Sequence, residues 1–240
     1  VVPFRDGTKG MFPHLLDRYK PGVIGLTPDG VRFCNESESY HDVGTSMTNA
    51  CSDKGETFMW LVCDHNCLSK YGLGYVKPAP LPYGPFVKNG YLKKGSTLHQ
   101  LAAEIGVEAA TLKQTVETYN KDAVNGEDPM FNRGATSFNR YLADPDNKPN
   151  PCVAPIQKGP FFALKVYMGD LGTFSGIPTD NYGKVLRPDG SKVGGLYAVG
   201  NDRHSVMGGT YPAAGITLGP IMTAGYVTGR HLAGIDDNLE

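Results

Sequence analysis

The chain has 240 residues, including 31 Gly and 18 Pro, and its 23 Lys and Arg nearly balance 24 Asp and Glu, for a formal net charge of -1. A near-neutral charge lacks the basic footprint of a nucleic-acid-binding protein, so we expect no nucleic-acid partner. No uninterrupted apolar run approaches the roughly 20 residues that span a bilayer, and we expect no transmembrane segment. Residues 1–6 also lack the pattern of a secretory signal.

The five cysteines show no paired framework, which favours a reducing compartment, and we expect the protein to be cytoplasmic. Cys63, His65 and Cys67 form the one cluster that suggests a metal site. Zinc usually takes four ligands, and no second pair follows at a recognisable spacing, so we predict no metal. Ordinary cysteines at a junction between a strand and a helix explain the spacing.

The first part of the chain predicts β-structure followed by a loop. Residues 23–33 contain two β-rich runs around Pro28-Asp29-Gly30, which predicts a hairpin, and residues 57–63 are typical of a short buried strand. Residues 72–95 are rich in Pro and Gly and predict a loop. Its aromatic residues either line an apolar pocket or pack among themselves; they are Tyr75, Tyr83, Phe86 and Tyr91.

Two helices follow. Thr97 and Gln100 form a capping-box pair, apolar residues from Leu98 to Ile105 follow at helical spacing, and Gly106 ends the helix. The next helix runs from about Glu108 to Ala123. Its apolar face consists of Leu112, Val116, Tyr119 and Ala123.

The chain then becomes a polar, proline-interrupted connection over residues 125–155, with a short helix at 137–142. A strand is expected at 161–168 and a second Pro-Asp-Gly hairpin within 177–193. The change of character predicts a domain boundary near residues 165–172.

Two final elements are a short apolar strand, Leu196–Gly200, and a helix, Ile216–Leu232. Between them lies the densest functional signal, which reads SVMGGTYPAAGITLGP from Ser205 to Pro220. A strand that ends in Gly lets another molecule approach the backbone, and the N–H groups at a helix start favour acceptor or anionic groups of a ligand. The pattern indicates a cofactor-binding corner, and a tightly packed strand–helix junction is the alternative.

This stretch resembles the C-terminal flavin-contacting segment of the 3-ketosteroid Δ1-dehydrogenases, FAD-dependent enzymes of the succinate dehydrogenase/fumarate reductase flavoprotein superfamily. Further stretches resemble the same family in the same order, namely residues 21–24, 29–37, 159–161, 169–173 and 180–190. The resemblance implies an oxidoreductase of steroid metabolism that introduces a C=C bond next to the 3-keto group. A proton would leave C2, and a hydride would pass from C1 to flavin N5.

Enzymes of this family begin with a Rossmann-type unit whose Gly-x-Gly-x-x-Gly motif seats the ADP half of FAD, and no such motif occurs here. We therefore interpret the chain as the C-terminal portion of a longer flavoprotein, with the N-terminal half of the same enzyme as its partner. Alone, the chain is expected to turn over no substrate and to retain FAD weakly or not at all.

The resemblance implies an α/β fold in two parts. Residues 1–168 would form an α+β substrate-binding (cap) domain, and residues 169–240 the C-terminal strand–helix segment of a Rossmann-like FAD domain. By motif position the cofactor-binding residues are Gly200, Asn201, Ser205, Thr217 and Leu218.

Three residues take catalytic roles by motif position. Tyr211 and Gly215 resemble the family pair that binds the 3-keto oxygen of a small apolar ketone, such as a steroid. A phenol O–H and a helix-start N–H are donors where negative charge develops as the α-proton leaves. Tyr40 falls where the family has a tyrosine proposed to take the C2 proton. Because tyrosine has a reference pKa of about 10, its neighbours have to stabilise the anion.

Two other functions fit the residues. A fumarate or enoate reductase of the same superfamily needs cations that hold a carboxylate, and Arg203 and His204 lie near the flavin segment. A non-catalytic small-molecule-binding or interaction domain is the second alternative. The choice between Δ1 and Δ4 chemistry also stays open.

Overall fold

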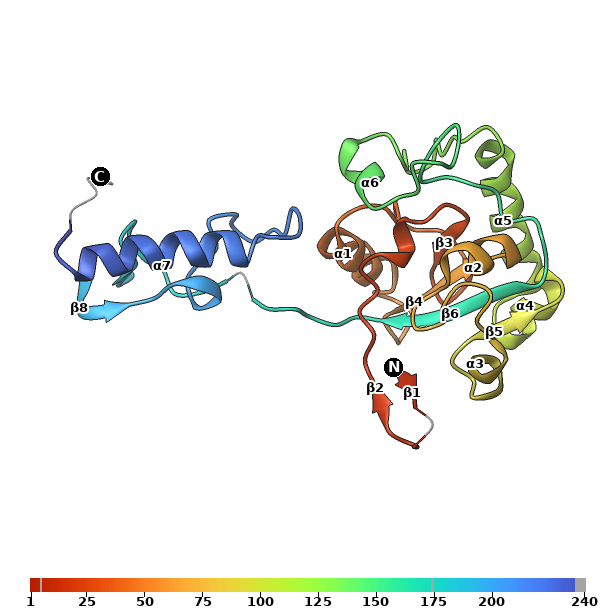
Figure 1. Cartoon of the computed structure of the whole chain (residues 1–240), viewed down its shortest axis with the longest axis horizontal. Helices are drawn as coiled ribbons and strands as arrows, with labels where there is room; N and C mark the ends of the chain where they lie inside the picture. The colour runs from red at the N-terminus through yellow and green to blue at the C-terminus, as the bar shows by residue number, and fades with distance from the viewer. Residues whose placement is uncertain (5, 174, 236–240) are drawn as a thin grey trace. The chain divides into compact units, whose positions relative to one another are not determined.

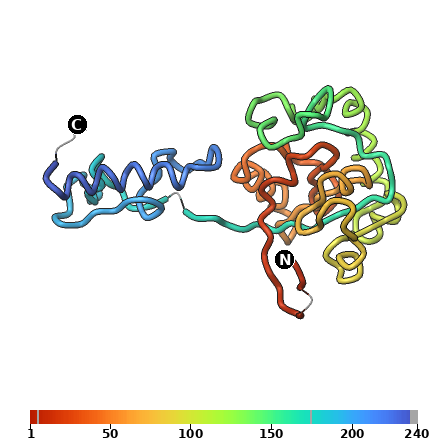
Figure 2. Tube along the Cα trace, viewed as in Figure 1, coloured from red at the N-terminus to blue at the C-terminus, as the bar shows by residue number. Residues whose placement is uncertain are grey.

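A computed structural model describes residues 1–4, 6–173 and 175–235, and it divides into two compact units (Figure 1). The first unit is Val1–Met168 and the second is Gly169–Glu240. Residues 236–240, the end of the predicted FAD-domain segment, lie outside the described residues. Figure 2 follows the chain through the first unit, from red to green, and into the second, in blue. Each unit has its own internal packing.

A four-stranded antiparallel sheet forms the centre of the first unit. Its strands lie in the order β3 (Val23–Leu26), β4 (Phe58–Cys63), β6 (Phe161–Tyr167) and β5 (Lys93–Gly95). Strand β4 is buried along its whole length because it lies between β3 and β6. Leu61 stands opposite Gly25 on one side and Leu164 on the other. Helices and sheet together give the mixed class expected from the sequence.

Side chains alternate between the two faces of this sheet with the period of two that strands impose. One face carries Ile24, Trp60 and Ala163 and packs against α4 (Leu98–Ile105) and α5 (Ala109–Ala123). The opposite face packs against α1 (Tyr40–Ala50) and α2 (His65–Tyr71). Its strand residues include Val23, Leu61 and Leu164. Each face therefore has an apolar core covered by two helices.

Both helices predicted after residue 96 are confirmed, with their ends. Thr97 Oγ1 accepts a hydrogen bond from the Gln100 amide at 3.2 Å, and Gly106 ends α4 in the left-handed conformation at φ 70°. Glu108 caps α5, because its carboxylate accepts from the Thr111 amide at 2.6 Å. The predicted strands at 57–63 and 161–168 are β4 and β6, and the short helix is α6 (Ser137–Tyr141).

Other expectations for this unit were wrong in part. The predicted loop 72–95 contains α3 (Gly84–Lys88), where proline fits the first helical turn, and the edge strand β5. Helix α1 was not predicted. The turn at Pro28–Gly30 forms, but only a single bridge between Leu26 and Arg32 continues it, because the Arg32 side chain enters a buried ionic cluster. Short elements complete the unit, namely β1 (Val2–Pro3), β2 (Lys9–Gly10) and η1 (Asp17–Tyr19).

The second unit consists of a hairpin, a turn and a long helix. Strands β7 (Lys184–Leu186) and β8 (Lys192–Tyr197) pair in antiparallel fashion around the predicted Pro-Asp-Gly turn. The 3-10 turn η2 (Gly200–Asp202) and helix α7 (Leu218–Leu232) follow. The predicted arm from Ile177 makes only isolated bridges at Ile177 and Thr179.

Two boundaries in this unit differ from the expectation. The strand predicted at 196–200 ends at Tyr197, because Gly200 adopts φ 67° and belongs to η2. The helix predicted from Ile216 begins at Leu218, since residues 214–217 first form a turn. Within the ranges described, no helix is both long and apolar enough to cross a membrane.

Candidate functional site

Side-chain contacts hold helix α7 against the rest of the second unit. The Thr228 hydroxyl donates to the Tyr182 carbonyl at 2.9 Å, and the Tyr182 ring lies 4.7 Å from the His231 ring. A Cβ built at Gly200 would lie 2.5 Å from Ile221 Cδ1. The glycine at 200 is therefore required by packing of η2 on α7 as well as by its positive φ.

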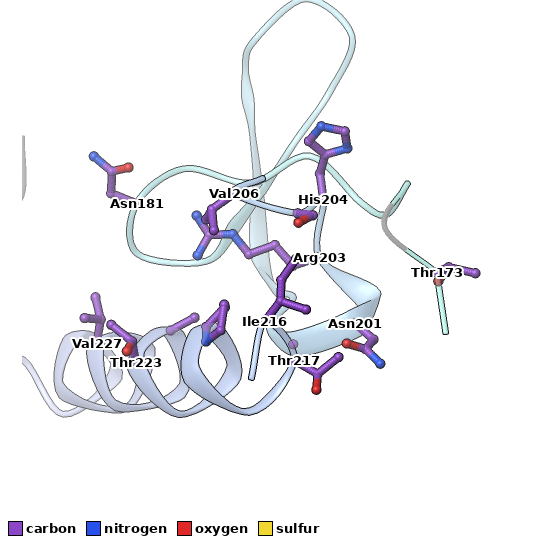
Figure 3. A pocket seen from close by; sticks show the side chains of 14 residues that line it. Thr173, Asn181, Asn201, Arg203, His204, Val206, Ile216, Thr217, Thr223 and Val227 are labelled. Carbon is purple, nitrogen blue, oxygen red and sulfur yellow. The ribbon is translucent and has the colours of Figure 1, made fainter. Parts of the chain in front are cut away.

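A pocket of about 540 Å³ lies within this unit, beside the start of α7 (Figure 3). Four of the five predicted cofactor-binding residues line it: Gly200, Asn201, Ser205 and Thr217. The α7 side of the lining has the i, i+3, i+4, i+7 spacing of one helix face, with Pro220, Thr223, Ala224 and Val227. Sequence reasoning did not predict Thr223, Ala224 and Val227 as lining residues. Their helical spacing from Pro220 is visible in the sequence and is the signal that could have identified them.

Arg203 and His204 both line the pocket, but they differ in orientation. The Arg203 side chain lies in the middle of the lining, whereas the His204 ring points away from α7 (Figure 3). One Arg203 nitrogen donates to the Asp180 carbonyl at 3.3 Å, and the Ile177 carbonyl accepts from the His204 amide at 2.9 Å. The Arg203 guanidinium is thus held by the turn that contains Asp180.

The glycine-rich loop has room for an external group. A Cβ built at Gly208, Gly209, Gly215 or Gly219 would meet nothing within 4 Å. Gly208 and Gly215 have φ of 64° and 97°, which explains glycine there, but Gly209 and Gly219 have neither a positive φ nor a crowded Cβ. Glycine without an internal reason fits close approach of a ligand to the backbone. The residues present therefore fit the predicted flavin.

Tyr211 and Gly215 flank the turn that leads into α7. The Tyr211 side chain is buried, and Gly215 is exposed, with its carbonyl accepting from the Gly219 amide at 2.9 Å. Helix α7 itself begins at Leu218 with no side-chain cap from Thr217. Among the described residues, Tyr211, Gly215 and Leu218 are not part of the pocket lining.

Tyr40 belongs to the first unit, where it is the first residue of α1 and half-buried. Ser39 precedes it as the helix cap: its Oγ accepts from the Asp42 amide at 3.1 Å. A residue at this position feels the positive end of the helix dipole, which favours an anionic side chain. The predicted role of Tyr40 as a base stays a prediction.

The aromatic residues of the predicted loop pack mainly among themselves. Tyr75 lies edge-on to Phe86 at 6.0 Å and also contacts Phe4 and Phe12, and Phe86 lies 6.1 Å from Tyr91. The Tyr75 amide also donates to the Tyr91 hydroxyl at 3.1 Å. These contacts show packing within the loop for Tyr75, Phe86 and Tyr91. Tyr83 instead packs on Phe162 at 5.1 Å and lines a second pocket, of about 470 Å³.

The cysteine cluster lies at the predicted junction between a strand and a helix. Strand β4 ends at Cys63, and Asp64 caps α2 by accepting from the Cys67 amide at 3.0 Å. Both thiols are buried, and the hydrogen bond between them, together with burial, raises the pKa of Cys63. Within the described part of the chain, no three His, Cys, Asp or Glu side chains form a group that could hold a metal ion.

Comparison with known proteins agrees with a flavin-linked fold. The FAD binding domain family matches residues 1–218. The chain is 47% identical, over 97% of its length, to a 4-oxocyclohex-2-ene-1-carboxylate 5-dehydrogenase of Sinomonas cyclohexanicum, of which it covers 40%. It is 39% identical, over 91% of its length, to a 3-oxosteroid 1-dehydrogenase of Mycolicibacterium smegmatis, of which it covers 39%.

A solved structure shows the same arrangement of elements. It is a 3-ketosteroid delta1-dehydrogenase from Sterolibacterium denitrificans in complex with 1,4-androstadiene-3,17-dione, with a TM-score of 0.87 and 38% identity over 98% of this chain and 42% of that one. The chain belongs to the FAD binding domain family, as the sequence resemblance predicted, and FAD is the cofactor that this family indicates. It spans about 40% of the length of the curated relatives that it matches.

Proposed function

We propose that the chain is the C-terminal portion of an FAD-dependent dehydrogenase that introduces a C=C bond next to the carbonyl of a cyclic ketone. The observation that carries the proposal is the glycine-rich turn before α7, where buried Tyr211 and the left-handed Gly215 precede an uncapped helix start. The 3-oxosteroid and oxocyclohexene carboxylate dehydrogenases at 39% and 47% identity support it. Residues 1–168 would be the substrate-binding domain, and residues 169–240 the end of the FAD domain.

The chemistry assigns separate tasks to the residues of this chain. The Tyr211 hydroxyl and the Gly215 amide would donate to the ketone oxygen and stabilise the charge that develops on it. Tyr40 would accept the proton from the carbon next to the carbonyl. Gly200, Asn201, Ser205, Thr217 and Leu218 would hold the flavin. When bound, FAD supplies the acceptor for the hydride from the neighbouring carbon.

The N-terminal half of the same enzyme is the proposed partner. Helix α7 exposes large apolar side chains, with Leu218 68%, Met222 72%, Tyr226 65% and Leu232 63% accessible. Soluble domains rarely leave such a stripe in water, so another protein surface is expected to cover it. Strand β8 supports this, since its Leu196 is also exposed and β7 is its one partner among the described strands.

Two substrate classes fit, and both contain a six-membered ring ketone with hydrogens next to the carbonyl. The apolar 3-oxosteroids follow from the sequence resemblance, and the relative at 39% identity acts on a 3-oxosteroid. A 4-oxocyclohexene carboxylate is the second candidate, favoured by the relative at 47% identity. The buried, unpaired state of all five cysteines supports a reducing compartment such as the cytoplasm.

The test is reconstitution with the preceding part of the longer protein. The chain and that part are co-produced, purified with FAD, and given a 3-oxosteroid or 4-oxocyclohex-2-ene-1-carboxylate with an artificial electron acceptor. Product with a new C=C bond from either ketone supports the proposal, and the preferred ketone identifies the substrate class. A yellow, folded complex that oxidises neither ketone but reduces fumarate would replace it with the reductase alternative. Failure to take up FAD would favour the non-catalytic alternative.

A further inference from the structure

Helix α1 is preceded by a tight turn, residues 35–39, that is almost wholly buried. The Glu38 amide donates to the Asn35 carbonyl at 3.1 Å, and the Ser37 amide donates to the Asn35 side chain at 2.9 Å. The turn ends at Ser39, the cap of α1, so its position fixes where Tyr40 begins the helix. The spacing of apolar residues in the sequence does not predict that this turn of polar residues is buried.

Arg18 holds this turn from one side. Arg18 is 1% exposed as a whole residue, and one of its Nη atoms donates both to the Glu36 carbonyl, at 2.6 Å, and to the Glu38 carbonyl. Tyr19, the next residue, donates its hydroxyl to the same Glu38 carbonyl at 3.0 Å. Two neighbouring side chains from η1 thus hold two of the three carbonyls that precede the α1 cap, those of Glu36 and Glu38.

Arg133 and Asn139 hold the turn from the other side. Arg133 donates to the Ser37 hydroxyl at 3.0 Å and to the Glu36 carboxylate at 3.2 Å. Asn139 donates to the Ser37 carbonyl at 3.1 Å, and it is completely buried. These contacts join residues about 100 positions apart in the chain.

Arg18 differs from the other buried arginines in its charge balance. Arg32 pairs with Glu36 and Asp128, and Arg133 pairs with Glu36. Among the described residues, no carboxylate forms an ion pair with Arg18. Its guanidinium also donates to the His14 carbonyl and to the Tyr19 hydroxyl at 3.5 Å, and it lies over the Tyr19 ring at 4.6 Å. Burying a cation without a counter-charge is costly, so we expect Arg18 to have a role that offsets this cost.

We propose that Arg18 is a positioning residue for Tyr40: by binding the Glu36 and Glu38 carbonyls it fixes the turn that presents Tyr40 at the start of α1. This inference rests on the proposed function of Tyr40 as the base. Arg18 does not touch the substrate in this account and acts through the backbone. A displacement of about 1 Å in a reacting group costs about 100-fold in rate, so loss of Arg18 is expected to lower kcat by that order.

The first test uses the 240-residue chain and needs no catalysis. Arg18→Met removes the donors at similar length, Arg18→Lys keeps a cation, and Leu112→Ala in α5 is a matched control that weakens the core away from α1. Amide hydrogen exchange is measured over residues 36–47 and over α5. Faster exchange confined to residues 36–47 in Arg18→Met, with partial recovery in Arg18→Lys, supports the proposal. Equal acceleration in both segments contradicts it.

The second test uses the FAD-loaded complex and a ketone deuterated next to the carbonyl. Wild type and Leu112→Ala should oxidise the ketone, Tyr40→Phe should not, and Arg18→Met should lose about 100-fold in kcat with little change in KM. If Arg18→Met does not fold, Tyr19→Phe removes one of the same contacts more gently and should lower kcat less. Full activity of Arg18→Met or of Tyr40→Phe overturns the positioning proposal. Inactive wild type instead overturns the proposed function.

Discussion

Gly200 and Ile221 lie in contact where η2 meets α7, and a Cβ at residue 200 would come 2.5 Å from Ile221 Cδ1. Gly209, in the loop between the same two elements, has open space around it. Glycine therefore serves different purposes at positions 200 and 209. One permits packing inside the chain, and the other leaves room for a group that the chain itself does not provide.

Gly200→Ala is expected to destabilise the second unit. Overpacking against Ile221 costs roughly 1–3 kcal/mol, and the positive φ of 67° adds strain. Hydrogen exchange of the α7 amides measures the loss in this unit alone. Gly209→Ala is the matched control: it should leave α7 exchange unchanged but reduce FAD retention in the assembled enzyme. Equal α7 exchange in Gly200→Ala and wild type would contradict the packing account.

Glu36 is expected to make the stability of the first unit depend on acid. Burial opposes its charge, but Arg32 and Arg133 outweigh burial and hold the pKa of the Glu36 carboxyl below its ordinary value of 4.5. Because the folded pKa is depressed, the stabilisation is fully present above the unfolded pKa and is lost as pH falls through the folded pKa.

The matching variant is Glu36→Gln, which leaves two buried arginines without this partner. It should lose roughly 3–5 kcal/mol at neutral pH and show a flatter pH dependence below about 4.5. Fluorescence of Trp60, the single tryptophan and a core residue of this unit, follows urea unfolding. Glu104→Gln, an exposed residue on α4, is the control and should change little. The same pH profile in Glu36→Gln and wild type would rule out this role.

Asp144 is largely buried, and its carboxyl should titrate below the ordinary pKa value of 3.8. Lys70 donates to it at 2.6 Å, and Tyr71 donates as well, which lowers the pKa of Asp144 to about 2. NMR titration of the carboxyl carbon measures this directly, and Lys70→Met should move the midpoint upward. Titration of Asp144 near its ordinary 3.8 in the wild-type chain would show that the cluster does not form.

The exposed face of α7 should matter for assembly and not for the stability of the isolated chain. Met222→Glu places a charge on this face, so it should prevent complex formation with the N-terminal half while leaving α7 exchange in the free chain unchanged. Tyr141→Glu, at an exposed aromatic on α6, is the matched control and should assemble normally. Size-exclusion chromatography of the co-produced halves gives the answer. Normal assembly of Met222→Glu would mean that this face is not the contact.

Local sequence signals predicted a good part of the fold. The cap at Thr97, the stop at Gly106 and the apolar run of β4 act within a few residues, and each formed as expected. Helix α1 was not predicted because its helical spacing of apolar residues is weak. It contains Gly44, and among its residues Val43 and Met47 alone are buried. Its position depends on contacts with Arg18 and residues beyond 130, which no local window contains.

The candidate site was predicted unevenly for a similar physical reason. A glycine-rich strand–helix junction is a local pattern, so Gly200, Asn201, Ser205 and Thr217 could be predicted as flavin-binding residues. They line one pocket, and their role toward the flavin stays a prediction. The packing role of Gly200 against Ile221 depends on how α7 folds back, which the spacing alone does not encode. Catalytic roles for Tyr40, Tyr211 and Gly215 stay predictions.

The most direct measurement is anaerobic flavin reduction in the complex of this chain with the proposed N-terminal half. Mixing the yellow wild-type complex with a saturating ring ketone should bleach the flavin absorbance and yield the unsaturated ketone. Tyr211→Phe should retain FAD but bleach about 100–1000-fold more slowly, the cost of removing one donor to the developing oxyanion. Bleaching of Tyr211→Phe at the wild-type rate, or no bleaching of the FAD-loaded wild type by either class of ketone, would contradict the account.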